Sequence, residues 1–286
     1  MFDTIFMQKS KIFSCFPNTN YLLEEMNAID VKDKINERTI AMLVLGSCEN
    51  HGDHMPFGSD FIFPVKLVEN IIKDLINSKD GLHNLDSNII LLPTIPYGVS
   101  SHHNTFKMTL SLEPITLISI IENIYSSLYR NGIRRVIVIN GHDGNIGPIE
   151  IASRNIKDKF PEMVIACLES WWVLVGQKNK GLFEVWDGLG HGGEAETSAM
   201  LYVRPDLVDI KLAPIQTIPN LPSEEVRIYW KFNELTNTGS TGAPHKATSE
   251  KGKEIVEILK DILISYLKKM DTCNWKYGLE RSNTDA

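Results

Sequence analysis

The sequence has few cysteines and no long apolar run. Its 286 residues include four cysteines, which form no CxxC pair and are spread from Cys15 to Cys273. This spacing argues against a disulfide framework and favours the reduced thiols of a cytoplasmic protein. No stretch approaches the roughly 20 apolar residues of a transmembrane helix, and the charged N-terminus lacks the apolar segment of a signal peptide. We therefore expect a soluble, cytoplasmic protein with no membrane partner.

A continuous basic surface is also missing. The formal net charge is −7, and the lysine-rich runs at 251–253 and 268–269 lie among acidic residues in a helical pattern. Nucleic acid is therefore not an expected partner. A hydrophobic content of 43% is enough for a sizeable core. The length suits one domain over 40–270, with an N-terminal extension over 1–39 that packs on this core and a polar C-terminal tail over 271–286.

Four short apolar runs predict strands, at 40–45, 89–93, 136–140 and 164–168. They are continuously apolar, which is typical of parallel strands that are buried on both faces. Helical periodicity occurs between and after them, at 63–76, 116–129, 146–160 and 249–270. The alternation predicts an α/β fold, a three-layer α/β/α sandwich with a mainly parallel central sheet. Cys48 and Cys167 lie within apolar surroundings, so we expect both thiols to be buried.

Histidines gather in the segments that follow the predicted strands. Six of the eight lie there or in the GHGGEAET segment: His51, His54, His102, His103, His142 and His191. Because the carboxyl ends of parallel strands meet at one edge of a sheet, this distribution predicts a single site. The first strand is not followed by GxGxxG, which disfavours a dinucleotide-binding oxidoreductase.

The loop after the first strand carries potential metal ligands. Glu49, His51 and Asp60 offer two carboxylates and an imidazole, a set that suits Zn²⁺, Mn²⁺ or Fe²⁺. Each residue also has a structural interpretation. Asp60 could cap the following helix, and His142 could lie in a tight strand-to-helix turn.

Five segments together resemble the creatininase superfamily over roughly residues 40 to 265. They are ENHGDHMPFGSD, YGVSSHHNTF, VIVINGHDGN, GHGGEAETSAML and GAPHKATSEKG, in this order. The resemblance implies a creatininase-like fold and a hydrolase with two divalent metal ions per subunit. It makes Glu49 and His142 ligands of one metal and His51 a ligand of the second, with Asp60 bridging the two.

The resemblance also implies catalytic and substrate-binding residues. His191 matches a histidine that relays protons, and Glu196 matches an acid that follows it. Trp186 and Asp187 match a pair that lines the substrate pocket, and Trp172 is a candidate second aromatic wall, although a core position explains it equally well. Further substrate-binding candidates from the same segments are Tyr97, His102, His103 and Asp143.

Two departures from the family pattern affect the predicted site. Gly144 stands where creatininase has a glutamate that binds the second metal, so we expect Glu194 to supply this ligand; the alternative is a solvent-exposed glutamate at a helix start. His102 replaces an acid, and Lys107–Met108 replace a Pro-Gly, where substrate should lie. Creatinine is therefore not the expected substrate.

The predicted site defines the expected chemistry. A water shared by two divalent cations would have its pKa lowered toward neutrality and would attack a polarised carbonyl carbon. The expected small-molecule substrate is a small cyclic amide or a formamide. Two alternatives remain, a hydrolase that opens the ring of a cyclic ketone derived from a cyclitol or sugar, and a non-catalytic ligand-binding relative. The resemblance further implies a homo-oligomer, a hexamer.

Overall fold

A computed structural model describes residues 21–77, 88–215, 217–222, 226 and 228–278. The first twenty residues of the predicted extension, with Cys15, and the last eight of the predicted tail lie outside the described residues.

The centre of the molecule is a four-stranded parallel sheet. Its strands are β1 (Ile40–Leu45), β2 (Ile89–Leu91), β3 (Arg135–Asn140) and β4 (Val164–Leu168), in the order β2-β1-β3-β4. In the register of the sheet, Ile40 of β1 lies beside Ile89 on one side and Arg135 on the other. All six residues of β1 are buried, as expected of a central strand. The four strands are those predicted, except that β2 ends two residues early and β3 begins one residue earlier.

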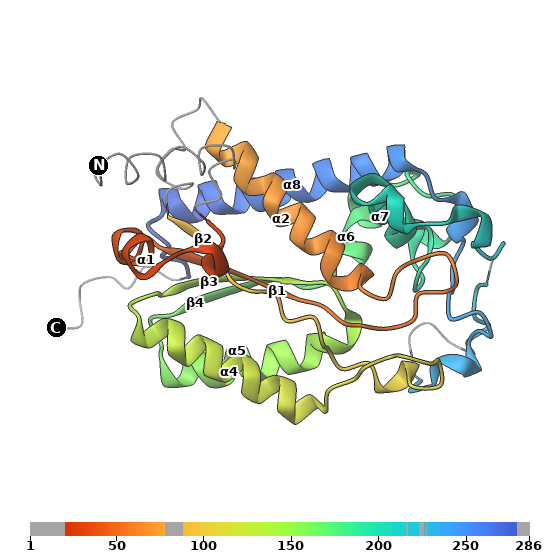
Figure 1. Ribbon diagram of the computed structural model, residues 1–286, viewed down its shortest axis with the longest axis horizontal. Helices are drawn as coiled ribbons and strands as arrows, with labels where there is room; N and C mark the ends of the chain where they lie inside the picture. Colours follow the sequence, from red (N-terminus) through yellow and green to blue (C-terminus); the bar gives the residue numbers. More distant parts are fainter. Residues whose placement is uncertain (1–20, 78–87, 216, 223–225, 227, 279–286) are drawn as a thin grey trace, which may run out of the picture.

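Helices cover both faces of the sheet (Figure 1). One layer contains α2 (Ser59–Asn77), α6 (Trp171–Lys178), α7 (Glu194–Val203) and α8 (Ser249–Thr272), and the other contains α4 (Pro114–Arg130) and α5 (Ile146–Lys159). Successive residues of β1 alternate between the layers, so that Met42 packs with the first and Leu43 with the second. The predicted three-layer sandwich is confirmed.

The strand order creates a crevice between β1 and β3. The chain leaves β1 toward α2 on one face and leaves β3 toward α5 on the other. This divergence at the carboxyl ends of neighbouring strands is where open α/β sheets bind ligands. Gly46 and Gly141 let the start of α2 approach both strand ends, because a Cβ atom would lie 2.7 Å and 1.8 Å, respectively, from the backbone oxygen of Asp60.

The described segments outside the domain predicted over 40–270 pack onto the sandwich. The backbone oxygen of Tyr21 accepts a hydrogen bond from the Leu91 N–H at 2.7 Å, beside the edge strand β2. A short helix, α1 (Ala28–Lys34), follows and is capped by the Asn27 side chain. At the other end, α8 continues to Thr272 and Trp275 is buried. The first residues of the predicted tail thus complete α8, and Trp275 packs on the core.

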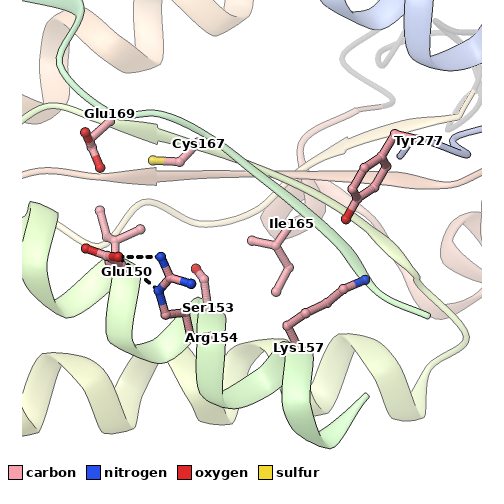
Figure 2. A pocket seen from close by; sticks show the side chains of 9 residues that line it. Glu150, Ser153, Arg154, Lys157, Ile165, Cys167, Glu169 and Tyr277 are labelled. Atoms are coloured by element: carbon pink, nitrogen blue, oxygen red, sulfur yellow. Dashed lines mark hydrogen bonds and ion pairs between the residues drawn. The ribbon is translucent and has the colours of Figure 1, made fainter. Parts of the chain in front are cut away.

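The edge strand β4 overturns the burial expected for Cys167. Cys167 is exposed, and Cys48 is half-buried. Cys167 and Ile165 line a cavity of about 400 Å³ between β4 and α5, where Glu150 and Arg154 form an ion pair (Figure 2). An edge strand has a neighbour on one side alone, which leaves part of its surface uncovered. Among the described helices, none has the length and apolar character needed to cross a membrane.

Candidate metal centre

Carboxylates and imidazoles converge at the β1–β3 crevice. Glu49 and His51 follow β1, Asp60 lies in the first turn of α2, and His142 follows β3; all four are buried. Glu196 joins them from the first turn of α7. Among the described residues, three sets of side chains could each hold a metal ion, because the ligand atoms within a set lie within 4.8 Å of one another. The sets are Glu49, Asp60 and His142; His51, Asp60 and Glu196; and Glu49, His51 and His191.

The Nδ1 atom of His142 faces two carboxylates. Its Nε2 lies 3.0 Å from the backbone oxygen of Val99, which can only accept a hydrogen bond, so Nε2 carries the proton. Its Nδ1 lies 3.2 Å from Glu49 Oε1 and 3.3 Å from Asp60 Oδ2. Burial would lower the pKa of His142, yet Glu49 and Asp60 raise it well above its usual range, so positive charge is favoured at this point.

His51 and His191 repeat the arrangement. The Nδ1–H of His51 donates to the backbone oxygen of Glu49 at 3.0 Å, while its Nε2 lies 2.8 Å from Asp60 Oδ1. The Nε2–H of His191 donates to the backbone oxygen of Asn50 at 2.6 Å, while its Nδ1 lies 3.6 Å from Glu49 Oε1. Donation from the outer nitrogen to a carbonyl is how metal-binding histidines are usually oriented.

Asp60 has the geometry of a bridging group. Its Oδ1 faces His51 and its Oδ2 faces His142, so the two oxygens point into different ligand sets. Neither Asp60 Oδ2 nor Glu49 Oε1 has a hydrogen-bond partner, although both atoms are buried. Buried acceptors of this kind are costly unless a proton or a cation compensates them.

Charge compensation dominates the electrostatics of the cluster. Burial alone would raise the pKa of Glu49, but His142 and His103 hold it well below its usual range. Burial would lower the pKa of His51, yet Asp60 raises it to about 10. Burial raises the pKa of Glu196 to about 7. Three carboxylates thus share a small buried volume that demands positive charge, and divalent cations fit this oxygen and nitrogen donor set.

Glu194 does not reach this centre, which corrects the prediction that it is a ligand. It is fully buried, but its oxygens accept hydrogen bonds from the N–H groups of Glu184 and Val185 and from Lys251. Residues 194 and 196 of one helix point about 200° apart, so only one of them can face the crevice. Glu196 is the one that does. At Gly144 no side chain is possible on this backbone, since a Cβ would lie 2.0 Å from Val99 O.

A cavity of about 280 Å³ lies over the candidate metal centre. Of the predicted residues, its lining includes His102, His103, Asp143, Trp172, Trp186, His191 and Glu196. A second cavity, of about 880 Å³, shares His102, Asp143 and Trp186 with the first. The structure thus brings most of the predicted substrate-binding residues to one place.

Three predicted residues lie elsewhere. Tyr97 is 45% exposed and lines neither cavity. Asp187 is also exposed and lines neither cavity, since its backbone packs on Gly176 of α6. His54 leaves the histidine cluster: its Nε2 is hydrogen-bonded to Thr197 Oγ1 and the backbone oxygen of Gly192, behind the site.

Sequence reasoning missed two aromatic walls. Trp230 and Phe232 line the smaller cavity, and the Trp230 ring lies 5.5 Å from that of His102. They belong to a segment without helical or strand periodicity, so the only available signal was two large aromatic residues close together in an irregular region. The sequence predicted Trp186 as a residue of the substrate pocket, but it did not predict the backbone conformation at this position. Trp186 and Asp187 have φ values of 51° and 50°, which cost about 1–3 kcal/mol for each such residue.

Fold and site together define an α/β protein with a candidate metal centre at the switch point of a parallel sheet. Residues 24–267 match the family model for creatininase, described as creatinine amidohydrolase. The chain belongs to the creatininase family, a group of hydrolases.

Three curated relatives are similar over most of their length. Creatinine amidohydrolase of Pseudomonas putida is 27% identical over 240 residues, which are 77% of this chain and 85% of the relative. The mycofactocin precursor peptide peptidase of Mycobacterium ulcerans is 24% identical, over 80% and 84%. The 3-dehydro-scyllo-inosose hydrolase of Thermotoga maritima is 24% identical, over 88% and 83%.

Solved structures agree on the fold. A manganese form of creatininase has a TM-score of 0.72 at 24% identity and covers 87% of this chain and 98% of its own. A Bacteroides fragilis structure has a TM-score of 0.77 at 23% identity, with coverages of 93% and 100%.

Proposed function

We propose that this protein is a hydrolase that depends on two divalent metal ions, of zinc, manganese or iron. Glu49, Asp60 and His142 would hold one ion, and His51, Asp60 and Glu196 the other. One observation carries the proposal: imidazole nitrogens and buried carboxylate oxygens converge within ligand distance of one another, and two of these oxygens have no hydrogen-bond partner. Such a cluster needs positive charge in a buried site, and divalent cations supply it to this oxygen and nitrogen donor set.

When bound, the two ions would supply an acidified water and a Lewis acid for a carbonyl oxygen. The side chains around them have separate tasks. His191 is held by its Nε2–H donation to Asn50, which leaves Nδ1 free to take up a proton. Burial, together with His51 and His103, keeps the pKa of His191 well below its usual range. A neutral His191 can therefore accept a proton and pass it to the leaving group.

The lining of the smaller cavity supports a compact, partly flat substrate. Trp172, Trp186 and Trp230 provide aromatic walls, and His102 adds a polar ring near the centre. A small cyclic amide or a formamide fits these walls, and two of the relatives carry names of enzymes that hydrolyse C–N bonds. Because His102 replaces an acid of the family pattern, we do not propose creatinine itself.

A second candidate reaction is the hydrolytic opening of a cyclic ketone derived from a cyclitol or sugar. The inosose hydrolase of Thermotoga maritima matches 88% of this chain, a larger share than the other two relatives. The same water and the same carbonyl polarisation would serve, and His191 would deliver its proton to carbon instead of nitrogen.

Metal analysis and an activity screen test the proposal together. Protein purified with Zn, Mn or Fe present should contain about two ions per chain, measured by mass spectrometry of the metals. The loaded enzyme should turn over a lactam, a formamide or a cyclic ketone, and the product identifies the bond that is cut. Only a trace of metal under these conditions would contradict the proposal, whatever the outcome of the screen.

We also propose that the protein forms a homo-oligomer, a hexamer as the family resemblance implies. Large exposed apolar side chains are concentrated between residues 210 and 229, which is typical of an interaction surface. They are Ile210, Leu212, Ile215, Ile218, Leu221, Val226, Ile228 and Tyr229. Analytical ultracentrifugation should give the mass of six chains, and a monomer at micromolar concentration would contradict this assembly.

A further inference from the structure

The buried carboxylate of Glu194 makes hydrogen bonds outside the candidate metal centre. Its Oε1 accepts a hydrogen bond from the backbone N–H of Glu184 at 3.1 Å, and its Oε2 accepts one from Val185 at 3.2 Å. Its side chain is fully buried at the first residue of α7. Glu194 therefore ties the start of α7 to the segment that precedes Trp186.

Lys251 of α8 completes this contact. Its Nζ lies 2.6 Å from Glu194 Oε1 and also donates to the backbone oxygen of Lys246 at 2.9 Å. It reaches Glu184 Oε1 at 3.1 Å, but the Glu184 side chain is 54% exposed, whereas that of Glu194 is fully buried. Glu194 and Lys251 thus form a largely buried charge pair between α7 and α8, and such pairs are sensitive to the loss of either partner.

The segment held by Glu194 leads directly into a strained stretch of backbone. Trp186 and Asp187 follow directly, both in the left-handed region, which side chains other than glycine rarely adopt. Gly176 of α6 gives Asp187 room, because a Cβ there would lie 2.5 Å from the backbone oxygen of Asp187. A strained conformation of this kind persists only where surrounding contacts fix it.

The strained segment forms part of the substrate cavity. Trp186 lines both the smaller and the larger cavity, and the smaller one is also lined by His102, His103 and His191. We propose that Glu194 and Lys251 form a clamp that positions Trp186 as a cavity wall. Glu194 is then a positioning residue for substrate and not a metal ligand. The clamp itself rests on the contacts above, and only the claim that the cavity binds a substrate rests on the proposed function.

The test compares Glu194→Gln with Glu184→Gln in the full-length protein. The control removes the exposed carboxylate that also contacts Lys251, but it keeps the backbone N–H that Glu194 binds. Acrylamide quenching of Trp186 fluorescence, obtained by subtracting the signal of matched Trp186→Phe variants, should increase in Glu194→Gln and stay at the wild-type value in Glu184→Gln. With a turnover substrate, KM should rise roughly tenfold in Glu194→Gln while kcat changes little.

A second variant covers the risk that one unpaired buried charge prevents folding. Glu194→Gln combined with Lys251→Met removes both charges together and should show the same increase in quenching. Metal content should equal that of the wild type in every variant. Loss of one metal ion in Glu194→Gln would overturn the clamp in favour of a ligand role, and wild-type quenching in both variants would overturn it as well. Quenching requires neither metal nor substrate, so failure of the proposed function would be seen separately.

Discussion

Replacing Asp60 with alanine should remove both metal ions and lower turnover by at least about 10³-fold, which corresponds to about 4 kcal/mol of activation free energy. The reason is geometric. Asp60 Oδ1 faces His51 and Asp60 Oδ2 faces His142, so one side chain contributes to both ligand sets. Without it, each remaining set has lost a charged donor. Metal analysis after gel filtration, together with steady-state rates, measures both effects.

Asp53→Ala is the matched control, because Asp53 is an exposed acid in the same loop and belongs to none of the ligand sets found among the described residues. It should keep the metal content and rate of the wild type. The bridging role would be wrong if Asp60→Ala retained one full equivalent of metal. Circular dichroism of both variants separates loss of metal from loss of fold.

The second large effect is expected at His191. His191→Ala should retain its metal ions and lose about 10²–10⁴-fold in kcat, the usual contribution of a positioned acid or base. His191 is oriented by Asn50 and lines the smaller cavity, where it can reach a leaving group. Added imidazole should restore part of the rate, because a small base can occupy the space that the side chain vacates.

His54→Gln provides the comparison for His191→Ala. His54 is also a buried histidine near Gly192, but its ring points to Thr197 behind the site. This variant should keep the wild-type kcat. If His191→Ala instead loses metal in proportion to its activity, His191 acts as a ligand in the set that contains Glu49 and His51. Undiminished turnover would remove His191 from the mechanism altogether.

The sequence predicted the sheet well because of the way parallel strands are buried. Helices cover both faces of β1, so all of its side chains are buried and its sequence, IAMLVL, is continuously apolar. The convergence of Glu49, His51, Asp60 and His142 followed from the same principle, since strand ends of a parallel sheet meet at one edge. Neither inference needed knowledge of any side-chain conformation.

The incorrect and missed predictions concern residues whose position depends on the rotation of a helix or on which elements lie beside them in the fold. Glu194 and Glu196 are two residues apart, and which of them faces the crevice depends on the rotation of α7 about its axis. Cys167 lies in an apolar run like that of β1, but β4 has no strand beyond it among the described residues, and local sequence does not show which strand is an edge. Trp230 and Phe232 reach the cavity through an irregular segment that has no period to detect.

The proposed role of Glu196 as a metal ligand, in place of a residue at position 144, has a consequence for how the molecule is held together. A ligand at 144 would have kept the second set on the loops after β1 and β3, whereas Glu196 belongs to a helix far along the chain. A metal ion shared by His51, Asp60 and Glu196 would therefore cross-link the N-terminal half of the sandwich to α7. Whatever binds only the folded chain stabilises it by mass action. With such an ion bound, metal supply and resistance to unfolding would be thermodynamically linked through the docking of α7.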